Sequence, residues 1–451
     1  MKPHAASPDT PIFDFLRRYE QSGVSRLHMP GHKGNPPKLP GGEKLPFSLD
    51  ITEIKGADAL FEAEGVIGRS EEIAAGLFGV KSTCYSAGGS TLSILGMVRT
   101  AYSLGGKILA ARNCHVAFVR ACILLDWQPL WLLPEYDGEH GLFRPATAGE
   151  VAAAMDADPE IKAVYLTSPD YYGGMADIAA IAREVHKRGG ILLVDNAHGA
   201  HLRFLPEDKH PMTLGADLCC DSAHKTLPVL TGGGYLHCNL DIPKETLKAN
   251  MALFGSTSPS YLILASLDLC NAYLAGQARE DFAAMCMRVS KTEGVLRERG
   301  VSLLPWKEDP AKITIDCQKC GWTHEKMAAF LRENQMEPEF AGGGKIILMV
   351  SPQTPERDFA RLEEAFSGFV PGAPIPYGPE KPCPKPVLTL RQAEFSPWER
   401  IPVEDALGRI AAESVITCPP AIPVAAAGER IGENEKKLLK NSGNFSLKVV
   451  K

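Results

Sequence analysis

The sequence predicts an α/β protein in which a mostly parallel sheet is covered by helices. Three short apolar runs, at 107–110, 163–166 and 191–194, have the length and composition of buried strands. Between the last two, the segment 177–186 carries its apolar residues at helical spacing, and a pair of glycines ends it. Strands that alternate with helices in this way are typical of parallel sheets with helical layers.

Composition narrows the class of protein further. The chain has 451 residues, 45% hydrophobic and 23% charged, with a net charge of −6, which fits two or three globular domains of roughly 150 residues each. No basic excess is present for binding nucleic acid, and no apolar run reaches the roughly 18 residues that span a bilayer. The first residues lack the pattern of a secretory signal, and the 12 scattered cysteines fit reduced thiols. We therefore expect a cytoplasmic protein that binds neither nucleic acid nor membranes.

We predict four regions along the chain. Residues 1–80 form an N-terminal arm of loops, residues 81–265 the large domain, residues 266–370 a smaller α+β domain and residues 371–451 a C-terminal domain. The patterns of the third region predict helices over 282–299 and 325–335 and strands over 312–315 and 345–350.

Two late segments are less regular. Residues 371–386 hold seven prolines in sixteen positions, which is typical of an extended linker, although a buried segment that wraps around the protein is an equal alternative. Residues 433–451 are polar, and we expect them to be loosely ordered.

A candidate nucleophile lies at Lys225. Ser222 and Lys225 match the S-x-x-K signature of penicillin-binding enzymes, but the S-D-N and K-T-G partners of that signature do not occur in the sequence. Ten uncharged residues follow Lys225, and a lysine that forms a Schiff base requires such desolvation. The alternative is a surface lysine whose stem lies on apolar neighbours.

Three further features precede Lys225. Glycines and hydroxyls at 88–91, in front of an apolar helix, suit a phosphate at a helix N-terminus. His115 follows the first predicted strand and could stack on an aromatic cofactor, or could be a satisfied polar group. Asp195 ends the third predicted strand, where it could keep a pyridinium nitrogen protonated or cap the next helix. The order of these features is the one that a pyridoxal phosphate enzyme of fold type I needs.

No metal site is predicted. Cys317 and Cys320 form the only C-x-x-C pair, and no second pair follows at the spacing of a structural zinc site. His198 and His201 could form a metal pair by their spacing, but no third ligand accompanies them.

Several segments match one known family, and through them the chain resembles the Orn/Lys/Arg decarboxylases over about residues 10–430. They are LHMPGHK at 27–33, DITE at 50–53, GAD at 56–58, GGST at 88–91, RNCH at 112–115, VDNAHGAH at 194–201, DSAHKTLP at 221–228 and STSPSY at 256–261. The resemblance implies an aspartate aminotransferase-like fold of type I, with pyridoxal 5'-phosphate bound by residues 81–265. The chain resembles the short form of the family, which lacks a receiver-like N-terminal domain and serves polyamine biosynthesis.

The resemblance also implies a role for each matching residue. Lys225 would form the Schiff base with the cofactor, and His224 would lie near the cofactor phosphate and the substrate. Thr257 and Ser258 resemble a segment that reaches the site of a neighbouring subunit, which implies a homodimer or larger oligomer. The residues expected to contact the phosphate or the ring are Gly88, Gly89, Ser90, Thr91, His115, Asp195, Ala197, His198 and Ser222, with Asp195 at the ring nitrogen and His115 and Ala197 on the two ring faces.

The function implied by the resemblance is decarboxylation of a basic amino acid. We expect arginine, giving agmatine, before lysine or ornithine, with His224 or Lys225 returning a proton to the α-carbon. The alternatives are a fold-type I aminotransferase or lyase for another amino acid, and a non-catalytic paralogue that binds the cofactor.

The distal cation of a basic substrate needs a carboxylate partner. Glu429 occupies the family's Pro-Pro-Gly-x-Pro…Pro-Gly-Glu motif, and Glu53 and Asp58 are the other candidates. Ala421 and Ala427 stand where the motif has glycine and proline, so we expect an altered loop in front of Glu429.

Overall fold

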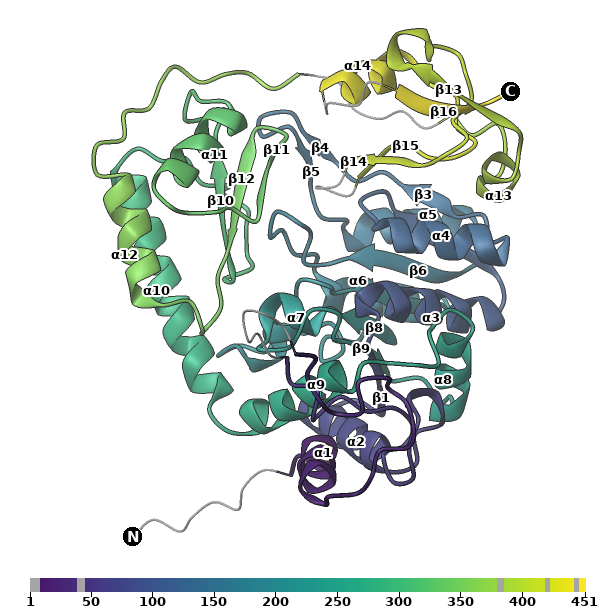
Figure 1. Ribbon diagram of the computed structural model, residues 1–451. Helices are drawn as coiled ribbons and strands as arrows, with labels where there is room; N and C mark the ends of the chain where they lie inside the picture. The colour runs from purple at the N-terminus through teal and green to yellow at the C-terminus, as the bar shows by residue number, and fades with distance from the viewer. Residues whose placement is uncertain (1–8, 39–44, 379–384, 418–421, 442–445) are drawn as a thin grey trace. The chain divides into compact units, whose positions relative to one another are not determined.

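The computed structural model describes residues 9–38, 45–378, 385–417, 422–441 and 446–451 (Figure 1). The chain divides into two compact units, each of which joins two stretches that are distant in sequence. The first unit contains residues 1–100 and 199–282, and the second contains residues 101–198 and 283–451. The four-region division made from the sequence stays a prediction.

The first unit carries antiparallel strands with β9 (Gly234–Cys238) between its two neighbours. β9 pairs on one side with β1 (Ser82–Ser86) and on the other with β8 (Leu218–Asp221). Because both neighbours run antiparallel to β9, their carboxyl ends lie at the same edge. β1 leads into α3 (Gly89–Ser103) and β8 into the short α7 (Ala223–Thr226). The predicted phosphate loop and the predicted lysine therefore leave the strands at one edge.

Helices cover these strands with apolar faces. In α2 (Val66–Phe78), Ile67, Ala74 and Phe78 are fully buried, and the helix ends at Gly79, whose φ of 70° is the left-handed conformation that closes helices. The remaining helical elements of this unit are α1 (Pro11–Gln21), η1 (Leu60–Glu62), η2 (Ala200–Phe204), α8 (Lys244–Ala252) and α9 (Tyr261–Ala275).

The second unit carries the parallel strands that the sequence predicts. Their order is β7-β6-β2-β3, and each pairing among them is parallel. The predicted strands are confirmed as β2 (Lys107–Ala111), β6 (Ile161–Thr167) and β7 (Ile191–Asp195), and β3 (Leu130–Leu132) lies beside β2. The predicted helix at 177–186 is confirmed as α6 (Ile178–Lys187), which begins where Asp177 accepts a hydrogen bond from the amide of Ala180 at 2.9 Å.

Two more helices and a hairpin complete this part of the second unit: α4 (Val116–Leu125), α5 (Ala148–Ala157), and β4 (Tyr136–Asp137) paired with β5 (Leu142–Phe143). Among the residues that the structure describes, no helix is both long and apolar enough to cross a membrane.

A smaller antiparallel sheet follows within the second unit. Its order is β10-β12-β11. The four elements predicted for this region are confirmed as α10 (Ala278–Glu298), β10 (Lys312–Asp316), α11 (His324–Glu333) and β12 (Lys345–Met349). β11 (Phe340–Gly342) and α12 (Glu356–Ala365) were not predicted.

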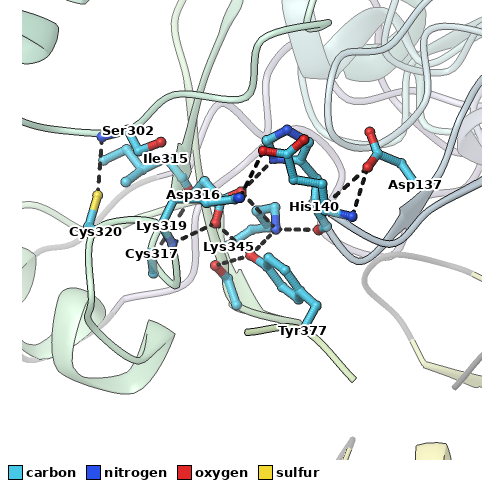
Figure 2. A network of polar contacts seen from close by, with 12 residues as sticks. Asp137, His140, Ser302, Ile315, Asp316, Cys317, Lys319, Cys320, Lys345 and Tyr377 are labelled. Carbon is cyan, nitrogen blue, oxygen red and sulfur yellow. Dashed lines mark hydrogen bonds and ion pairs between the residues drawn. The ribbon is translucent and has the colours of Figure 1, made fainter. Parts of the chain in front are cut away.

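Residues 371–378 of the proline-rich segment lie along this small sheet but are exposed apart from the half-buried Ile375 and Tyr377, so the alternative of a buried segment is wrong for them; residues 379–384 lie outside the described residues. The amide of Ile375 donates to the carbonyl of Gln318 at 2.8 Å, and the hydroxyl of Tyr377 donates to Asp316 at 2.5 Å. Figure 2 shows the buried cluster that results, in which Lys345 lies 3.4 Å from the same carboxylate. Burial lowers the pKa of Lys345 to about 8.

The C-terminal residues are ordered, so the expectation of a loosely ordered segment at 433–451 is wrong for the described residues. α14 (Glu433–Asn441) is followed by β16 (Ser446–Val450), which pairs with β13 (Trp398–Pro402). Leu439, Leu447 and Val449 are fully buried in a separate small core. The other elements of this region are α13 (Leu390–Glu394), η3 (Val403–Asp405), β14 (Val415–Thr417) and β15 (Ile422–Ala425).

Candidate active site

The predicted phosphate loop closes around the start of α3. Gly89 begins the helix with a φ of 65°, and its amide donates to the carbonyl of Gly232 at 2.7 Å. The hydroxyl of Ser222, at the end of β8, donates to the hydroxyl of Ser90 at 2.7 Å. A Cβ on Gly234 would lie 3.3 Å from the amide nitrogen of Ser90 and 2.7 Å from a carbonyl oxygen of β8, so only glycine allows this approach.

This arrangement fits a phosphate group. The first amides of a helix lack partners within the helix and point along its axis, where the helix dipole favours an anion. Two hydroxyls, one from the first turn of α3 and one from the N-cap of α7, meet there, because Ser90 and Ser222 are hydrogen-bonded and both buried. Thr91 is half-buried in the first turn of the same helix. Helix amides combined with serine and threonine hydroxyls are a common set of phosphate ligands.

His224 and Lys225 lie beside this loop, on the single turn of α7. The Nδ1 of His224 is 3.0 Å from the carbonyl oxygen of Gly233, so this nitrogen carries a proton and donates it. A Cβ on Gly89 would lie 3.9 Å from the Cε1 of His224, which places the ring within contact range of the phosphate loop. Lys225 is half-buried, and its amide donates to the carbonyl of Ser222 at 3.1 Å.

A cavity of about 240 Å³ adjoins the loop. Gly88 and Thr91 line one side of it and the segment 255–260 lines another, with Ser258 among the lining residues and Thr257 outside them. Both Thr257 and Ser258 are exposed. The structure therefore brings one of the two residues of this motif to the phosphate loop of its own chain.

The predicted ring-binding residues lie in the second unit, at the ends of β2 and β7. His115 caps the N-terminus of α4, where its Nδ1 accepts a hydrogen bond from the amide of Ala117 at 3.1 Å. Nε2 is then the protonated nitrogen of a neutral His115 ring. The imidazole is half-buried.

Asp195 is the last residue of β7 and is buried. Its carboxylate accepts hydrogen bonds from the hydroxyl of Tyr165 at 3.0 Å and from the amide of Ala197 at 3.1 Å. His198 is also buried, with its ring 5.0 Å from that of Tyr171 in an edge-on contact. The sequence analysis did not identify Tyr165, although a buried tyrosine in a central strand must find a partner for its hydroxyl.

The three candidate substrate carboxylates differ sharply in their surroundings. Glu429 is buried and forms a two-pronged ion pair with Arg112, at 2.6 and 2.7 Å. Asp58 accepts hydrogen bonds from five backbone amides at 2.8–3.2 Å, at the start of α2. Glu53 is exposed and accepts a hydrogen bond from the hydroxyl of Thr52.

The altered motif in front of Glu429 is only partly described. Ala421 lies outside the described residues. Ala427 is buried, and its amide donates to the hydroxyl of Ser414 at 3.0 Å; a proline at this position has no amide proton and could not make this bond.

One cluster of the described residues has the distances of a metal site, since ligand atoms of His210, Cys219 and Asp221 all lie within 4.8 Å of one another. Hydrogen bonds explain the cluster otherwise. The Nδ1 of His210 accepts the amide proton of Met212, so its protonated Nε2 donates to Asp221 at 3.0 Å, and the Nε2 of His237 lies 3.3 Å from the same oxygen. Burial alone would raise the pKa of Asp221, but His210 and then His237 lower it well below its usual range.

The two cysteines of the C-x-x-C pair are buried side chains of the protein interior. Cys317 and Cys320 are buried, and the sulfur of Cys320 accepts the amide proton of Ser302 at 3.1 Å. Burial raises the pKa of Cys320 to about 11 and that of Cys317 further. Both side chains are therefore neutral thiols near pH 7 rather than thiolate ligands or nucleophiles.

The protein thus has an α/β fold in which α7, the short helix that carries Lys225, lies beside the predicted phosphate loop. The chain matches the model of the Orn/Lys/Arg decarboxylase major domain over residues 10–299 and that of the C-terminal domain over residues 381–441. The chain belongs to the Orn/Lys/Arg decarboxylase family, and the prediction of an amino acid decarboxylase is confirmed at this level.

Two relatives from Bacillus subtilis match almost the whole chain. An arginine decarboxylase is 29% identical over 463 residues, covering 96% of this chain and 94% of the relative. The uncharacterised protein YaaO is 30% identical over 461 residues, covering 94% and 92%.

Solved structures confirm the predicted fold. The lysine decarboxylase LdcF of Francisella novicida superposes with a TM-score of 0.82 at 19% identity, covering 98% of this chain and 81% of that one. An aspartate aminotransferase of Thermus thermophilus superposes with a TM-score of 0.55 at 14% identity, covering 67% and 90%.

Proposed function

We propose that this protein decarboxylates arginine to agmatine with pyridoxal 5'-phosphate as its cofactor, and that lysine or ornithine is the next candidate substrate. The observation that carries the proposal is the junction of α3 and α7, where Ser90 and Ser222 meet beside His224 and Lys225. The names of full-length relatives as arginine decarboxylases support the choice of substrate.

The phosphate loop fits the phosphate of the cofactor. The amides of the α3 N-terminus and the hydroxyls of Ser90 and Ser222 would hold that phosphate, and Lys225 would hold the aldehyde carbon. From the resemblance to the family, His115 and Asp195 would hold the ring, with Asp195 at the ring nitrogen. The cofactor, when bound, accepts the electron pair that the departing carbon dioxide leaves behind.

The chain's own groups would then return a proton to the α-carbon. His224 donates its Nδ1 proton to the carbonyl of Gly233, which fixes the ring and leaves Nε2 as the nitrogen that can carry a proton to the substrate. Lys225 is the alternative donor, because an ammonium on the following residue can reach the same site. A group within hydrogen-bond reach of the reacting carbon is the requirement for either role.

Glu53 is the carboxylate that we assign to the distal cation of the substrate. Asp58 is engaged by five amides and Glu429 by Arg112, whereas Glu53 is exposed. Burial and then the charges of Glu53 and Asp58 raise the pKa of Tyr261, so Glu53 lies near the start of α9. The segment directly before α9 lines the cavity of the phosphate loop.

The remaining parts of the proposal follow from the family. A homodimer or larger oligomer would bring Thr257 and Ser258 to a neighbouring subunit, where their exposed side chains are free to reach a second site. We also propose a role in polyamine biosynthesis, and cytoplasmic residence stays a prediction.

Amine formation from arginine, lysine and ornithine tests the proposal. The purified protein, supplied with pyridoxal phosphate, is expected to form agmatine as its dominant product. Lys225→Ala should abolish this product, and Lys209→Ala, which changes a surface lysine of the same unit, should not. Formation of a keto acid in place of an amine would indicate an aminotransferase. No product from any of the three substrates would contradict the proposed function.

A further inference from the structure

A buried ion pair joins Glu429 of the C-terminal region to Arg112, two residues that lie 317 positions apart in the chain. Their side chains are 4% and 1% exposed. The two terminal nitrogens of the Arg112 guanidinium donate to the carboxylate, at 2.6 and 2.7 Å, and the amide of Ala426 donates to it at 2.8 Å. Parallel hydrogen bonds of this kind fix the orientation of both groups.

Arg112 is held from two other sides as well. Its Nε donates to the carbonyl of Pro423 at 3.1 Å, and its guanidinium lies 4.9 Å from the ring centre of Trp131. The backbone amide of Arg112 donates to the carbonyl of Leu132, in the strand beside β2. The side chain is thus enclosed between the end of a sheet strand and the loop around β15.

Arg112 lies at the start of the turn that carries His115. Arg112 directly follows β2, and the turn that it begins ends three residues later at His115, the N-cap of α4. The C-terminal region also holds the other end of that helix, because Arg391 of α13 donates to the carbonyls of Ile123 and Leu124 at 3.0 and 3.2 Å. α4 is therefore attached to the C-terminal region near both ends.

We infer that Glu429 is a positioning residue, which through Arg112 sets the turn that carries His115, and that it does not bind the distal cation of the substrate. Three of the roughly four acceptor positions of this buried carboxylate are occupied, two by Arg112 and one by the amide of Ala426. A substrate cation could reach it only by displacing Arg112. This inference concerns the same site as the proposed function. Only its kinetic test rests on that function.

Hydrogen exchange of the cofactor-free protein tests the structural half of the inference. Glu429→Gln and Arg112→Lys are each expected to speed exchange of amides 113–120 at least about tenfold, since a buried pair loses much of its strength when one partner is changed. Glu404→Gln, which changes an exposed carboxylate of the same region that pairs with Lys440, should leave these amides unchanged. The double variant should exchange about as fast as either single variant, because both substitutions remove the same contact.

Steady-state kinetics with arginine and lysine test the other half. The inference predicts that Glu429→Gln and Arg112→Lys lower kcat to a similar extent and leave the preference between the two substrates within about twofold, since the pair is shared. A rise of tenfold or more in the KM for arginine in Glu429→Gln alone, with exchange of 113–120 unchanged, would overturn it. If the wild-type protein forms no amine, the exchange experiment still decides whether the pair sets this turn, so failure of the proposed function is distinguishable.

Discussion

Asp195 and Asp221 occupy equivalent positions in the two units, yet their surroundings are different. Each is the last residue of a buried strand, β7 in one case and β8 in the other, and each is buried itself. Asp195 accepts hydrogen bonds from a hydroxyl and a backbone amide. Asp221 accepts them from the imidazoles of His210 and His237.

The difference shows that the position of a carboxylate at the end of a strand does not by itself determine its role. Two imidazoles stabilise the charge of Asp221 inside the protein, and they hold the strand that leads into the lysine turn. Two of the hydrogen bonds to Asp195 come from a hydroxyl and a backbone amide, and they orient its carboxylate. We propose Asp195 as the partner of the cationic ring nitrogen and a structural role for Asp221.

Asp195→Asn tests the first half of this comparison, and we expect its effect to be the largest. The variant keeps an acceptor for Tyr165 but loses the negative charge, so kcat should fall about a thousandfold, within the range for loss of a proton-holding group. Thermal unfolding should change little. Tyr165→Phe is the matched variant, because it keeps the ring and loses only the hydroxyl, and its loss of activity should be much smaller. Equal losses in the two variants would contradict the assigned role of Asp195.

Asp221→Asn should act on stability instead. The substitution removes the charge that both imidazoles face, and breaking a buried pair of this kind costs about 3 kcal/mol in the free energy of unfolding. Denaturant unfolding measures this loss, with the exposed Asp241→Asn as control. If Asp221→Asn is as stable as the wild type and its kcat falls as far as that of Asp195→Asn, the structural role assigned to Asp221 is contradicted.

Glu53→Gln extends the comparison to an exposed carboxylate. Loss of its charge should raise the KM for arginine about tenfold, equivalent to about 1.4 kcal/mol of binding free energy, and leave kcat almost unchanged. Glu64→Gln removes a neighbouring exposed charge of the same unit and serves as control. If both variants keep the wild-type KM, Glu53 does not bind the distal cation.

The smallest effect is expected from pH. Burial lowers the pKa of His237 from 6.5, although Asp221 opposes the shift. Below pH 6.5 the unfolded chain binds a proton at this residue that the folded protein does not bind, so the free energy of unfolding falls as the pH decreases from that value. Above pH 6.5 the contribution is fully present. His237→Gln should reduce the slope between pH 6.5 and 5 by up to about 1.4 kcal/mol per pH unit, and the exposed His186→Gln should not change it.

The parallel strands of the second unit were predictable from the sequence because strands buried on both faces are continuous apolar runs. The predicted run at 191–194 differs from β7 only by Asp195. The C-terminal residues were not predictable in the same way. Leu447 and Val449 alternate with Ser446, Lys448 and Val450, and this short, mixed pattern becomes a strand with two buried residues only because β13 lies beside it.

The residues of the candidate site also differ in how far the sequence could predict them. Residues that belong to a local motif, such as Ser90 before a helix or Lys225 after a strand, could be predicted for the site from the sequence, and their roles stay predictions. Partners that meet only in the folded chain were not, and Arg112 with Glu429 is the clearest case, since no spacing connects them. The assignment of Glu429 to the substrate came from its motif alone and could not take account of a distant arginine.

Covalent attachment of pyridoxal phosphate tests the central claim, that Lys225 beside the phosphate loop carries the chemistry. The protein is incubated with the cofactor, reduced with borohydride, digested and analysed by mass spectrometry, with Lys209→Ala and Lys225→Ala treated alike. We expect one modified peptide, which contains Lys225 and is lost only in Lys225→Ala. Stable labelling of a different lysine, with the peptide around Lys225 unmodified, would contradict it.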